Sequence, residues 1–359
     1  MNILLLNNEN NGGGLLTHFV YLANMLKQKG HSVYVIRPLA NGEKGRFEGL
    51  GEYYPLDLSA KNPMKFRKNL QVIKSIIRDK KIDIMHTHNR MASIYAQLAY
   101  RQTGIPFVWT LHLNNIPSDP VHRLLTFHGK KAIVVGSELI PFCTNHLKIP
   151  REEIAVVYNG VFEDAYREYS EEKKNRIREQ YRVAENQKVI VLLSRLVPVK
   201  GHKTMISAAA KVEGDYVILF TGESMEPGYK EELQEMIRHK GLEDKIRFIG
   251  YVNPVDVLNI SDLFVLPSEN EGFGISMIES FFMHVPVIRT RTGGYEDVKE
   301  FVIPMENEKD LAENLKLFME GKLDMREKVE KGYQFAVENC TCSAMVDKVI
   351  EIYGEALRK

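Results

Sequence analysis

The sequence alternates twice between short, fully apolar runs and longer segments with a helical pattern, and this feature limits the fold more than any other. In the first half, apolar runs such as Ile3–Leu6 and Phe107–His112 alternate with helical segments such as Met91–Arg101. This order is typical of a parallel sheet that helices cover on both faces. The alternation stops at Asn159-Gly160-Val161 and restarts at Val189–Leu193. The pattern therefore predicts two doubly wound α/β domains.

The same pattern predicts where the other elements lie. Further strands are expected at Ser32–Ile36, Ile82–His86, Ala132–Val135, Ile154–Tyr158, Tyr216–Thr221, Ile246–Ile249, Leu263–Leu266 and Val285–Ile288. Helices are expected at Glu138–Leu147, Glu308–Glu320, Asp324–Glu338 and Ser343–Leu357. Two such domains would face each other across a cleft at the carboxyl ends of both sheets, where ligands bind in this kind of sheet.

Composition and length exclude several classes of protein. The chain has 359 residues, enough for about two domains, and no apolar run approaches the roughly 20 residues that span a bilayer. Its first residues do not form a basic segment followed by an apolar stretch, so we expect no signal peptide. The three cysteines, Cys143, Cys340 and Cys342, cannot make a disulfide framework and fit a reducing compartment. We therefore expect a cytoplasmic protein.

The charge is unevenly divided between the two halves. Residues 1–160 carry 20 Lys and Arg against 11 Asp and Glu, whereas the whole chain has a net charge of +1. Much of the excess lies in Lys61–Lys81, which also has an apolar stripe at helical spacing. This segment is either a solvated helix packed on a sheet or a helix that also contacts an anionic surface, such as lipid headgroups or a phosphate-bearing acceptor. It lacks the interleaved aromatic residues of a nucleic-acid site.

Two loops that follow strands carry residues suited to phosphate. Gly12-Gly13-Gly14 follows the first strand and opens a helix, where backbone amides can approach an anion. Its spacing differs from the dinucleotide-binding fingerprint, which disfavours a nicotinamide- or flavin-dependent oxidoreductase. Arg195 and Lys200 follow the strand Val189–Leu193, and a helix starts at Gly201. Two cations beside a helix N-terminus suit a diphosphate, although exposed surface cations give the same pattern.

The segment Ser268–Glu279 is the sharpest motif. It follows the strand Leu263–Leu266 and leads into a helix, and its glycines expose backbone amides at the start of that helix. Glu271 lies in the loop and Glu279 lies two turns into the helix. Carboxylates beside a phosphate cradle are suited to sugar hydroxyls, which donate hydrogen bonds to them. The segment therefore indicates a ligand that carries both phosphate and sugar.

With these motifs in order, the sequence resembles the retaining, GT-B-fold glycosyltransferases of family 4 over most of its length. The resemblance is carried by Gly13-Gly14, Asp83-Ile-Met-His-Thr-His88, Leu111-His112, Asn159-Gly160-Val161, Arg195-Leu-Val-Pro-Val-Lys200-Gly201, and Glu271 followed after seven residues by Glu279. It implies two Rossmann-like domains. The first would comprise residues 1–160 and about 341–359, because the C-terminal helix would cross back to it, and this domain would bind the acceptor. Residues 161–340 would bind a nucleotide-sugar donor.

The resemblance also implies roles for single residues. Arg195 and Lys200 would hold the donor diphosphate, Glu279 the donor ribose and Glu271 the donor sugar. Phe273, Gly274 and Ile275 would lend backbone amides, His112 would lie next to the reacting sugar, and Gly13 and Gly14 would approach the phosphates. Three single residues and two segments depart from the usual family pattern, namely Ser194, Val199, His284, the basic run Arg289-Thr290-Arg291 and the short segment from Glu296 to Pro304.

These implications predict the reaction. We expect a retaining transferase that moves a hexosyl or N-acetylhexosaminyl group from a UDP-sugar to an acceptor in cell-envelope polysaccharide, glycolipid or teichoic-acid-type synthesis, at the inner face of the membrane. We expect no cofactor and no metal, because the chain contains no Asp-x-Asp and fixed cations can stabilise the leaving diphosphate. A three-histidine zinc site of His86, His88 and His112 is the metal alternative. A GT-B sugar-nucleotide epimerase and a non-catalytic nucleotide-sugar-binding protein are the functional alternatives.

Overall fold

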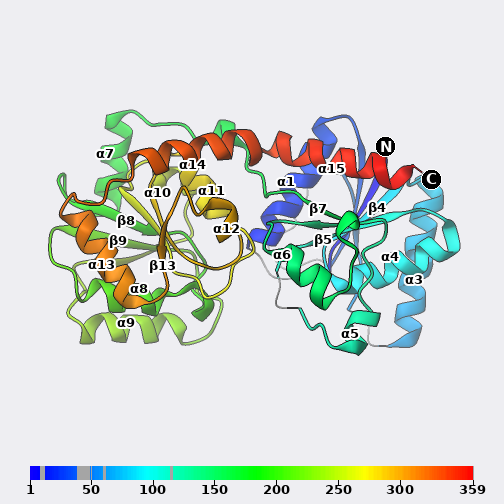
Figure 1. Cartoon of the computed structure of the whole chain (residues 1–359), viewed down its shortest axis with the longest axis horizontal. Helices are drawn as coiled ribbons and strands as arrows, with labels where there is room; N and C mark the ends of the chain where they lie inside the picture. Colours follow the sequence, from blue (N-terminus) through cyan, green and yellow to red (C-terminus); the bar gives the residue numbers. More distant parts are fainter. Residues whose placement is uncertain (9–12, 39–48, 50, 60–61, 114–115, 359) are drawn as a thin grey trace. The chain divides into compact units, whose positions relative to one another are not determined.

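The computed structural model describes residues 1–8, 13–38, 49, 51–59, 62–113 and 116–358. The chain folds into two compact units, which are coloured by sequence in Figure 1. The first unit comprises Met1–Gly160 and Cys342–Lys359, and the second comprises Val161–Thr341. Each unit is a parallel sheet with helices on both faces, so the predicted α/β class is confirmed.

The described part of the first unit contains a seven-stranded parallel sheet in the order β3-β2-β1-β4-β5-β6-β7. Its strands are β1 (Asn2–Leu6), β2 (Ser32–Arg37), β3 (Glu52–Pro55), β4 (Ile84–Thr87), β5 (Phe107–Leu111), β6 (Lys131–Val134) and β7 (Ile154–Val156). The sequence analysis missed β3, because this edge strand is exposed at Glu52 and Pro55 and has no apolar run. Burial on both faces gives the central strands their continuous apolar character.

Helices from both ends of the chain cover the first sheet. On one face lie α1 (Gly14–Gln28) and α15 (Cys342–Leu357), which pack against each other. On the other face lie α3 (Pro63–Asp79) and α4 (Arg90–Thr103). The return of α15 to the first unit confirms the expected crossing of the C-terminal helix, and Figure 1 shows it in red beside α1.

The remaining elements of the first unit are short. They are α5 (Pro120–Leu124), α6 (Leu139–Pro141), a π-helical turn (Phe142–His146) and a 3-10 turn (Arg151–Glu153). The helix expected over Glu138–Leu147 is present as a helical segment over residues 139–146, but only its first turn is α-helical and the rest is a π-helical turn. All three cysteines are buried and none forms a disulfide, in agreement with the expectation from the sequence.

The described part of the second unit contains a six-stranded parallel sheet in the order β10-β9-β8-β11-β12-β13. Its strands are β8 (Lys188–Leu192), β9 (Tyr216–Thr221), β10 (Ile246–Gly250), β11 (Leu263–Leu266), β12 (Val287–Thr290) and β13 (Ile303–Met305). Short β13 was also missed. The strand expected at Val285–Ile288 begins two residues later, after Pro286, which cannot donate to a sheet ladder.

Helices α8, α9 and α13 pack on one face of the second sheet, whereas α11 packs against α14. The bounds are α7 (Glu171–Gln180), α8 (His202–Ala209), α9 (Tyr229–His239), α10 (Pro254–Leu258), α11 (Ile275–Phe282), α12 (Tyr295–Val298), α13 (Glu308–Met319) and α14 (Arg326–Asn339), with 3-10 turns at Glu163–Ala165 and Pro198–Lys200. The close approach of α14 to α11 depends on Gly332, where a Cβ atom would lie 2.9 Å from the Phe281 ring. No helix in the described ranges is both long and apolar enough to cross a membrane.

Each sheet has a point at which the strand order reverses, and ligands bind beyond the carboxyl ends of the strands at such points. In the first sheet the reversal lies between β1 and β4, and in the second it lies between β8 and β11. The loops after β8 and β11 are those that carry the two cations and the acidic motif identified in the sequence. The fold therefore brings these two motifs together.

Candidate functional site

An ion pair joins the two loops at the reversal point of the second sheet. Lys200 Nζ lies 2.5 Å from Glu271 Oε1, and the two side chains are 19% and 9% exposed. The Ser268 hydroxyl donates to the same oxygen at 2.8 Å. The backbone N–H of Glu269 also donates to the carbonyl of Val199 at 2.8 Å, which ties one loop to the other. These contacts hold a lysine and a carboxylate side by side in a sheltered position.

Arg195 supplies a second cation in the loop after β8. Its side chain is half-buried, and among the described residues its guanidinium makes no hydrogen bond or ion pair. A sheltered guanidinium is suited to bidentate binding of a phosphate oxygen pair. Arg195 can therefore meet an anionic ligand without first breaking a contact within the described part of the protein.

Glycines let these loops pack backbone against backbone. Gly201 has a φ of 73°, and a Cβ atom there would lie 2.0 Å from the carbonyl oxygen of Pro267. A Cβ atom on Gly293 would lie 2.1 Å from the carbonyl oxygen of Glu271. Gly274, with a φ of 86°, precedes α11, and no side chain caps that helix. The first N–H groups of α11 can therefore bind an anion.

Glu279 lies on the second turn of α11 and is buried. The hydroxyl of Tyr166 donates to its Oε1 at 2.7 Å. Burial raises the pKa of Glu279 to about 7, and the hydrogen bond from Tyr166 opposes this shift to a smaller extent. A buried carboxylate with one bonded oxygen can accept hydrogen bonds from ligand hydroxyl groups.

Arg289, at the end of β12, is fully buried and binds the loop that follows it. Its guanidinium donates to the carbonyl oxygens of Thr292, at 3.1 Å, and Gly293, at 2.7 Å. Gly293 is the residue that packs against the backbone of Glu271. Arg289 thus holds one wall of the acidic loop.

Four histidines gather at the carboxyl end of the first sheet. His86 bonds through Nδ1 to the hydroxyl of Tyr353 and through Nε2 to that of Thr110, both at 2.7 Å. Nδ1 of His88 lies 3.2 Å from Nε2 of His112. The ring of His18, on α1, packs edge-on against His112 at a centroid distance of 4.8 Å. The sequence analysis did not single out His18 for this group.

These histidines are neutral at pH 7. Burial lowers the pKa of His18 to about 4, against a smaller opposing effect of Asn159. Burial and the charge of His18 lower the pKa of His86 to about 3. Burial, followed by the neighbouring imidazoles, holds the pKa values of His88 and His112 well below their usual range. Neutral rings can contact a sugar or ligate a metal.

The group that could hold a metal differs from the alternative expected from sequence. Ring nitrogens of His18, His88 and His112 lie within 4.8 Å of one another. His86 is not among them, because both of its nitrogens are engaged by hydroxyl groups. Ligands of one tetrahedral zinc lie about 3.3 Å apart, so the rings would have to move to bind it. The expectation of no metal stays a prediction.

Gly13 and Gly14 lie at the reversal point of the first sheet. Gly13, with a φ of 116°, precedes α1, and Gly14 is its first residue. Close to this point the side chain of Asn89, after β4, donates to that of Asn7, after β1, at 2.8 Å. Gly12 lies outside the described residues. The phosphate-binding role expected of these glycines stays a prediction.

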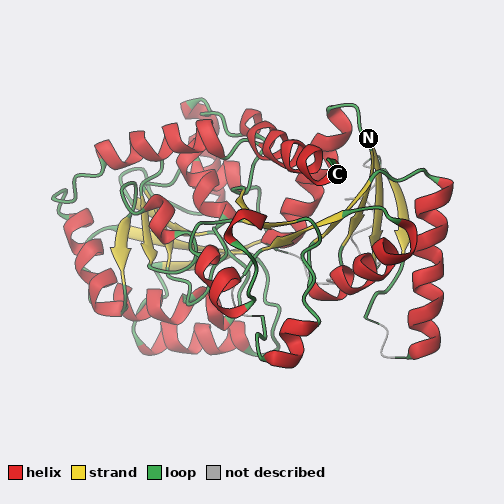
Figure 2. Ribbon diagram, turned by 45° about the vertical axis from the view of Figure 1, so that its right-hand side comes forward, coloured by secondary structure: helices red, strands yellow, loops and turns green. Residues whose placement is uncertain are grey.

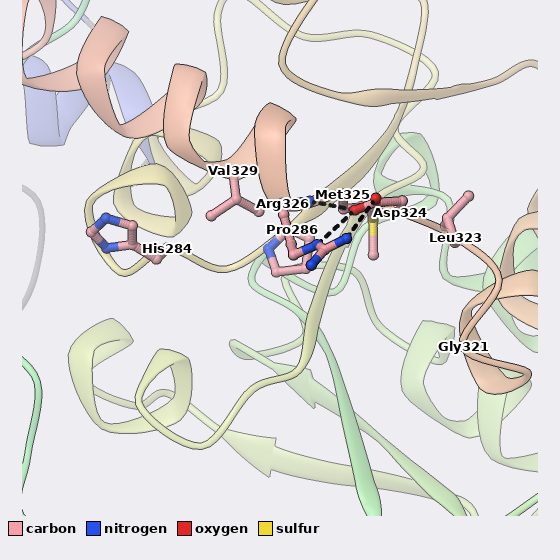
Figure 3. A pocket seen from close by; sticks show the side chains of 8 residues that line it. All are labelled: His284, Pro286, Gly321, Leu323, Asp324, Met325, Arg326 and Val329. Carbon is pink, nitrogen blue, oxygen red and sulfur yellow. Dashed lines mark hydrogen bonds and ion pairs between the residues drawn. The ribbon is translucent and has the colours of Figure 1, made fainter.

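A separate hollow of about 500 Å³ lies in the second unit. Figure 3 shows its lining, with His284 on one side and the ion pair of Asp324 and Arg326 on the other. The hollow borders Pro286, just before β12, and so lies at the amino end of the sheet. It is therefore on the opposite edge from Lys200 and Glu271.

The structure brings together part of the residue set expected from sequence. Lys200 and Glu271 are in contact, and Glu279 is sheltered on α11. Phe273 is 1% exposed, so its ring packs inside the protein, and the role expected of its backbone amide stays a prediction. The analysis missed Tyr166 and Ser268, since a single hydroxyl residue carries no spacing signal. It noted Arg289 only as an unusual basic residue.

Comparison with known proteins shows the class to which this architecture belongs. Residues 12–164 match the family model described as Glycosyltransferase Family 4, and residues 173–334 match the model described as Glycosyl transferases group 1. A glycosyltransferase from Rickettsia africae has a solved structure with a TM-score of 0.88 and 25% identity, covering 100% of this chain and 99% of that chain. The fold is GT-B. The chain belongs to the glycosyltransferases that combine these two domains.

Other similar proteins match over different shares of the chain. N-acetyl-α-D-glucosaminyl L-malate synthase of Bacillus anthracis is 30% identical over 69% of this chain and 64% of its own length. An uncharacterized glycosyltransferase of Methanocaldococcus jannaschii is 24% identical over 80% of this chain and 78% of its own length. Anabaena HepE, solved in complex with UDP, has a TM-score of 0.88 at 18% identity, covering 99% of this chain and 100% of that chain.

Proposed function

We propose that the chain is a retaining glycosyltransferase that moves an N-acetylhexosaminyl or hexosyl group from a UDP-sugar to an acceptor hydroxyl. The observation that carries this proposal is the contact of Glu271 with both Lys200 and Ser268 at the reversal point of the second sheet, where the loop that holds Lys200 also holds Arg195. A cation pair and carboxylates in one sheltered place match a ligand with both a diphosphate and sugar hydroxyls.

The charges of the site give the mechanism. When the bond between the anomeric carbon and the diphosphate breaks, negative charge develops on the leaving diphosphate. Arg195, Lys200 and the N–H groups at the start of α11 stabilise that charge. The cations are already in place, so the proposed reaction needs no metal ion. Glu271 accepts hydrogen bonds from the sugar and Glu279 from the ribose.

Glu271 forms an ion pair with Lys200 at 2.5 Å. A bound diphosphate would compete with Glu271 for this cation, and Glu271 would then be available to the sugar hydroxyls. The hydroxyl of Ser268 keeps the carboxylate in place during this exchange. We assign no protein nucleophile: the acceptor attacks on the face from which the diphosphate leaves, and a diphosphate oxygen takes the acceptor proton.

The donor and acceptor are proposed from the relatives. The names of the relatives from Bacillus anthracis and Niallia circulans specify N-acetylglucosaminyl groups. HepE, which shares the fold, was solved with UDP and with UDP-glucose. A putative teichuronic acid glycosyltransferase of Bacillus subtilis is also similar to this chain. We therefore propose UDP as the carrier and a cell-envelope precursor, met at the inner face of the membrane, as the acceptor.

The test is donor turnover in matched variants. Purified protein is incubated with UDP-N-acetylglucosamine or UDP-glucose, with and without candidate acceptors, and UDP release is measured. Arg195→Gln and Lys200→Gln should lower turnover by about a hundredfold or more, because each removes a charge from the leaving group. Lys203→Gln is the control, because this exposed lysine on α8 pairs with Glu232. Turnover close to that of the unmodified protein in both site variants would rule out the proposed roles.

A further inference from the structure

Tyr166 lies at the start of the second unit, and its hydroxyl reaches the buried carboxylate of α11. The second unit begins at Val161, and the 3-10 turn over Glu163–Ala165 leads directly to Tyr166. The Tyr166 hydroxyl donates to Glu279 Oε1 at 2.7 Å, and Glu279 is 7% exposed. Among the described residues, the other carboxylate oxygen, Oε2, has no hydrogen-bond partner. Tyr166 therefore occupies one oxygen of Glu279 and leaves the second for a ligand.

The backbone on both sides of Tyr166 is fixed by hydrogen bonds. The N–H of Tyr166 donates to the carbonyl of Glu163 at 2.9 Å. On the other side, the Asn259 side chain, just after α10, donates to the carbonyl of Arg167 at 3.1 Å and accepts from the N–H of Tyr169 at 2.7 Å. Helices α10 and α11 pack against each other, as Figure 1 shows. The segment that carries Tyr166 is therefore tied to the neighbour of α11.

The ring of Tyr166 has a contact of its own with α11. It is inclined by 29° to the ring of Phe282, at a centroid distance of 6.2 Å. Phe282 is the last residue of α11, the helix that also carries Glu279. Replacing Tyr166 by phenylalanine would keep this ring contact and remove the hydroxyl alone. The chain thus allows the hydrogen bond to be tested without a change in packing.

The hydroxyl of Tyr166 also favours the ionised form of Glu279. Burial raises the pKa of Glu279 to about 7, and the hydrogen bond from Tyr166 lowers it by a smaller amount. Helices α10 and α14 and strands β11 and β12 also pack against α11, and none of their described titratable groups shifts this pKa. Without the hydroxyl, the pKa of Glu279 would be higher, and more of the carboxyl would be protonated at pH 7.

We propose that Tyr166 is a positioning residue for the donor ribose: it holds Oε1 of Glu279, so that Oε2 meets the ribose hydroxyl groups. A side chain that is already held in its bound orientation loses less freedom when the ligand arrives. An ionised carboxylate accepts hydrogen bonds through both oxygens, whereas a protonated one has less capacity to accept them. This inference rests on the proposed function, in which Glu279 binds the ribose, and adds the residue that keeps Glu279 oriented and ionised.

The test is titration calorimetry of UDP binding between pH 6 and pH 9. Tyr166→Phe should weaken binding about tenfold at pH 7, because a hydrogen bond to a charged group is lost. The loss should become smaller towards pH 9, where Glu279 is ionised in both proteins. Tyr169→Phe is the matched control: it removes the hydroxyl of another half-buried tyrosine, which donates to Asp256 at 2.9 Å, and it should leave the dissociation constant unchanged. Binding that recovers at high pH also shows that Tyr166→Phe is folded.

A second comparison shows whether the effect acts through Glu279. In the Glu279→Gln background, Tyr166→Phe should not alter the pH profile, because glutamine does not titrate. Equal UDP affinity of the unmodified chain and Tyr166→Phe, or a loss of the same size at every pH, would overturn the role of Tyr166 and leave the proposed function intact. An unmodified chain that binds no UDP would instead contradict the proposed function, and the role of Tyr166 would fall with it.

Discussion

Acid should destabilise the first unit through its buried histidines, and His18 allows the size of the effect to be calculated. Burial lowers the pKa of His18 from 6.5 to about 4. The unfolded chain therefore binds a proton between these two pH values that the folded chain does not bind. The contribution of His18 to stability is full above pH 6.5 and is lost as the pH falls towards 4. At pH 5 the loss is about 2 kcal/mol. His86, His88 and His112 shift in the same direction and add to it.

The single tryptophan makes this effect measurable in the first unit alone. Trp109 lies in β5 and is 1% exposed, and it is the only tryptophan in the chain. Urea unfolding followed by its fluorescence therefore reports on the sheet beside the histidines, whereas the unfolding of the second unit has no such signal. The free energy of unfolding is measured at pH 8 and pH 5, for the unmodified protein and for His18→Gln.

The difference between the two pH values is the informative quantity. His18→Gln lowers stability at pH 8 through altered packing, but it should reduce the pH 8 to pH 5 difference by about 2 kcal/mol. His146→Gln, which changes an exposed histidine of the same unit, should leave that difference unchanged. An equal difference in the unmodified protein and in His18→Gln would refute the reasoning. A histidine that is buried and neutral in the folded protein must make the free energy of unfolding depend on pH.

Three further predictions concern the second unit. Because burial raises the pKa of Glu279 to about 7, UDP affinity should fall as the pH drops below 7, and titration calorimetry should find a flatter pH profile for Glu279→Gln. Gly293→Ala places a Cβ atom 2.1 Å from the carbonyl oxygen of Glu271, so it should raise the donor KM at least tenfold, measured by initial rates. Arg289→Met leaves buried carbonyl groups without their donor and should cost about 1–3 kcal/mol in chemical unfolding.

Much of the fold could be predicted because the central strands are buried on both faces. Such strands read as short apolar runs, and those at Tyr216–Thr221 and Leu263–Leu266 have the predicted bounds. Two of the edge strands carried no such signal: β3 has no apolar run, and β13 is short and contains Pro304. Proline decided another difference: Pro286 lies within the expected strand Val285–Ile288, and the observed strand begins only after it.

The candidate site was only partly predictable. Loops that follow adjacent parallel strands meet at one edge of the sheet, which explains why Lys200 and Glu271 could be placed together from sequence. A hydrogen-bond partner distant in sequence has no such constraint. Tyr166 reaches Glu279 across 113 positions, and nothing in the order of residues indicates that contact. The sequence analysis did not single out His18, because its neighbours His88 and His112 follow β4 and β5, far from it in the chain.

The most direct test of the account is the thermal stability of the chain with UDP, GDP, ADP and dTDP, each in the presence of EDTA. A ligand at about 100 times its dissociation constant adds about 2.7 kcal/mol of stability, which raises the melting temperature by several degrees. The account predicts a clear rise with UDP that EDTA does not remove and that K200Q and R195Q abolish. A chain that shows no rise with any nucleotide, or an equal rise in both variants, would contradict the claim that these cations form a metal-free donor site.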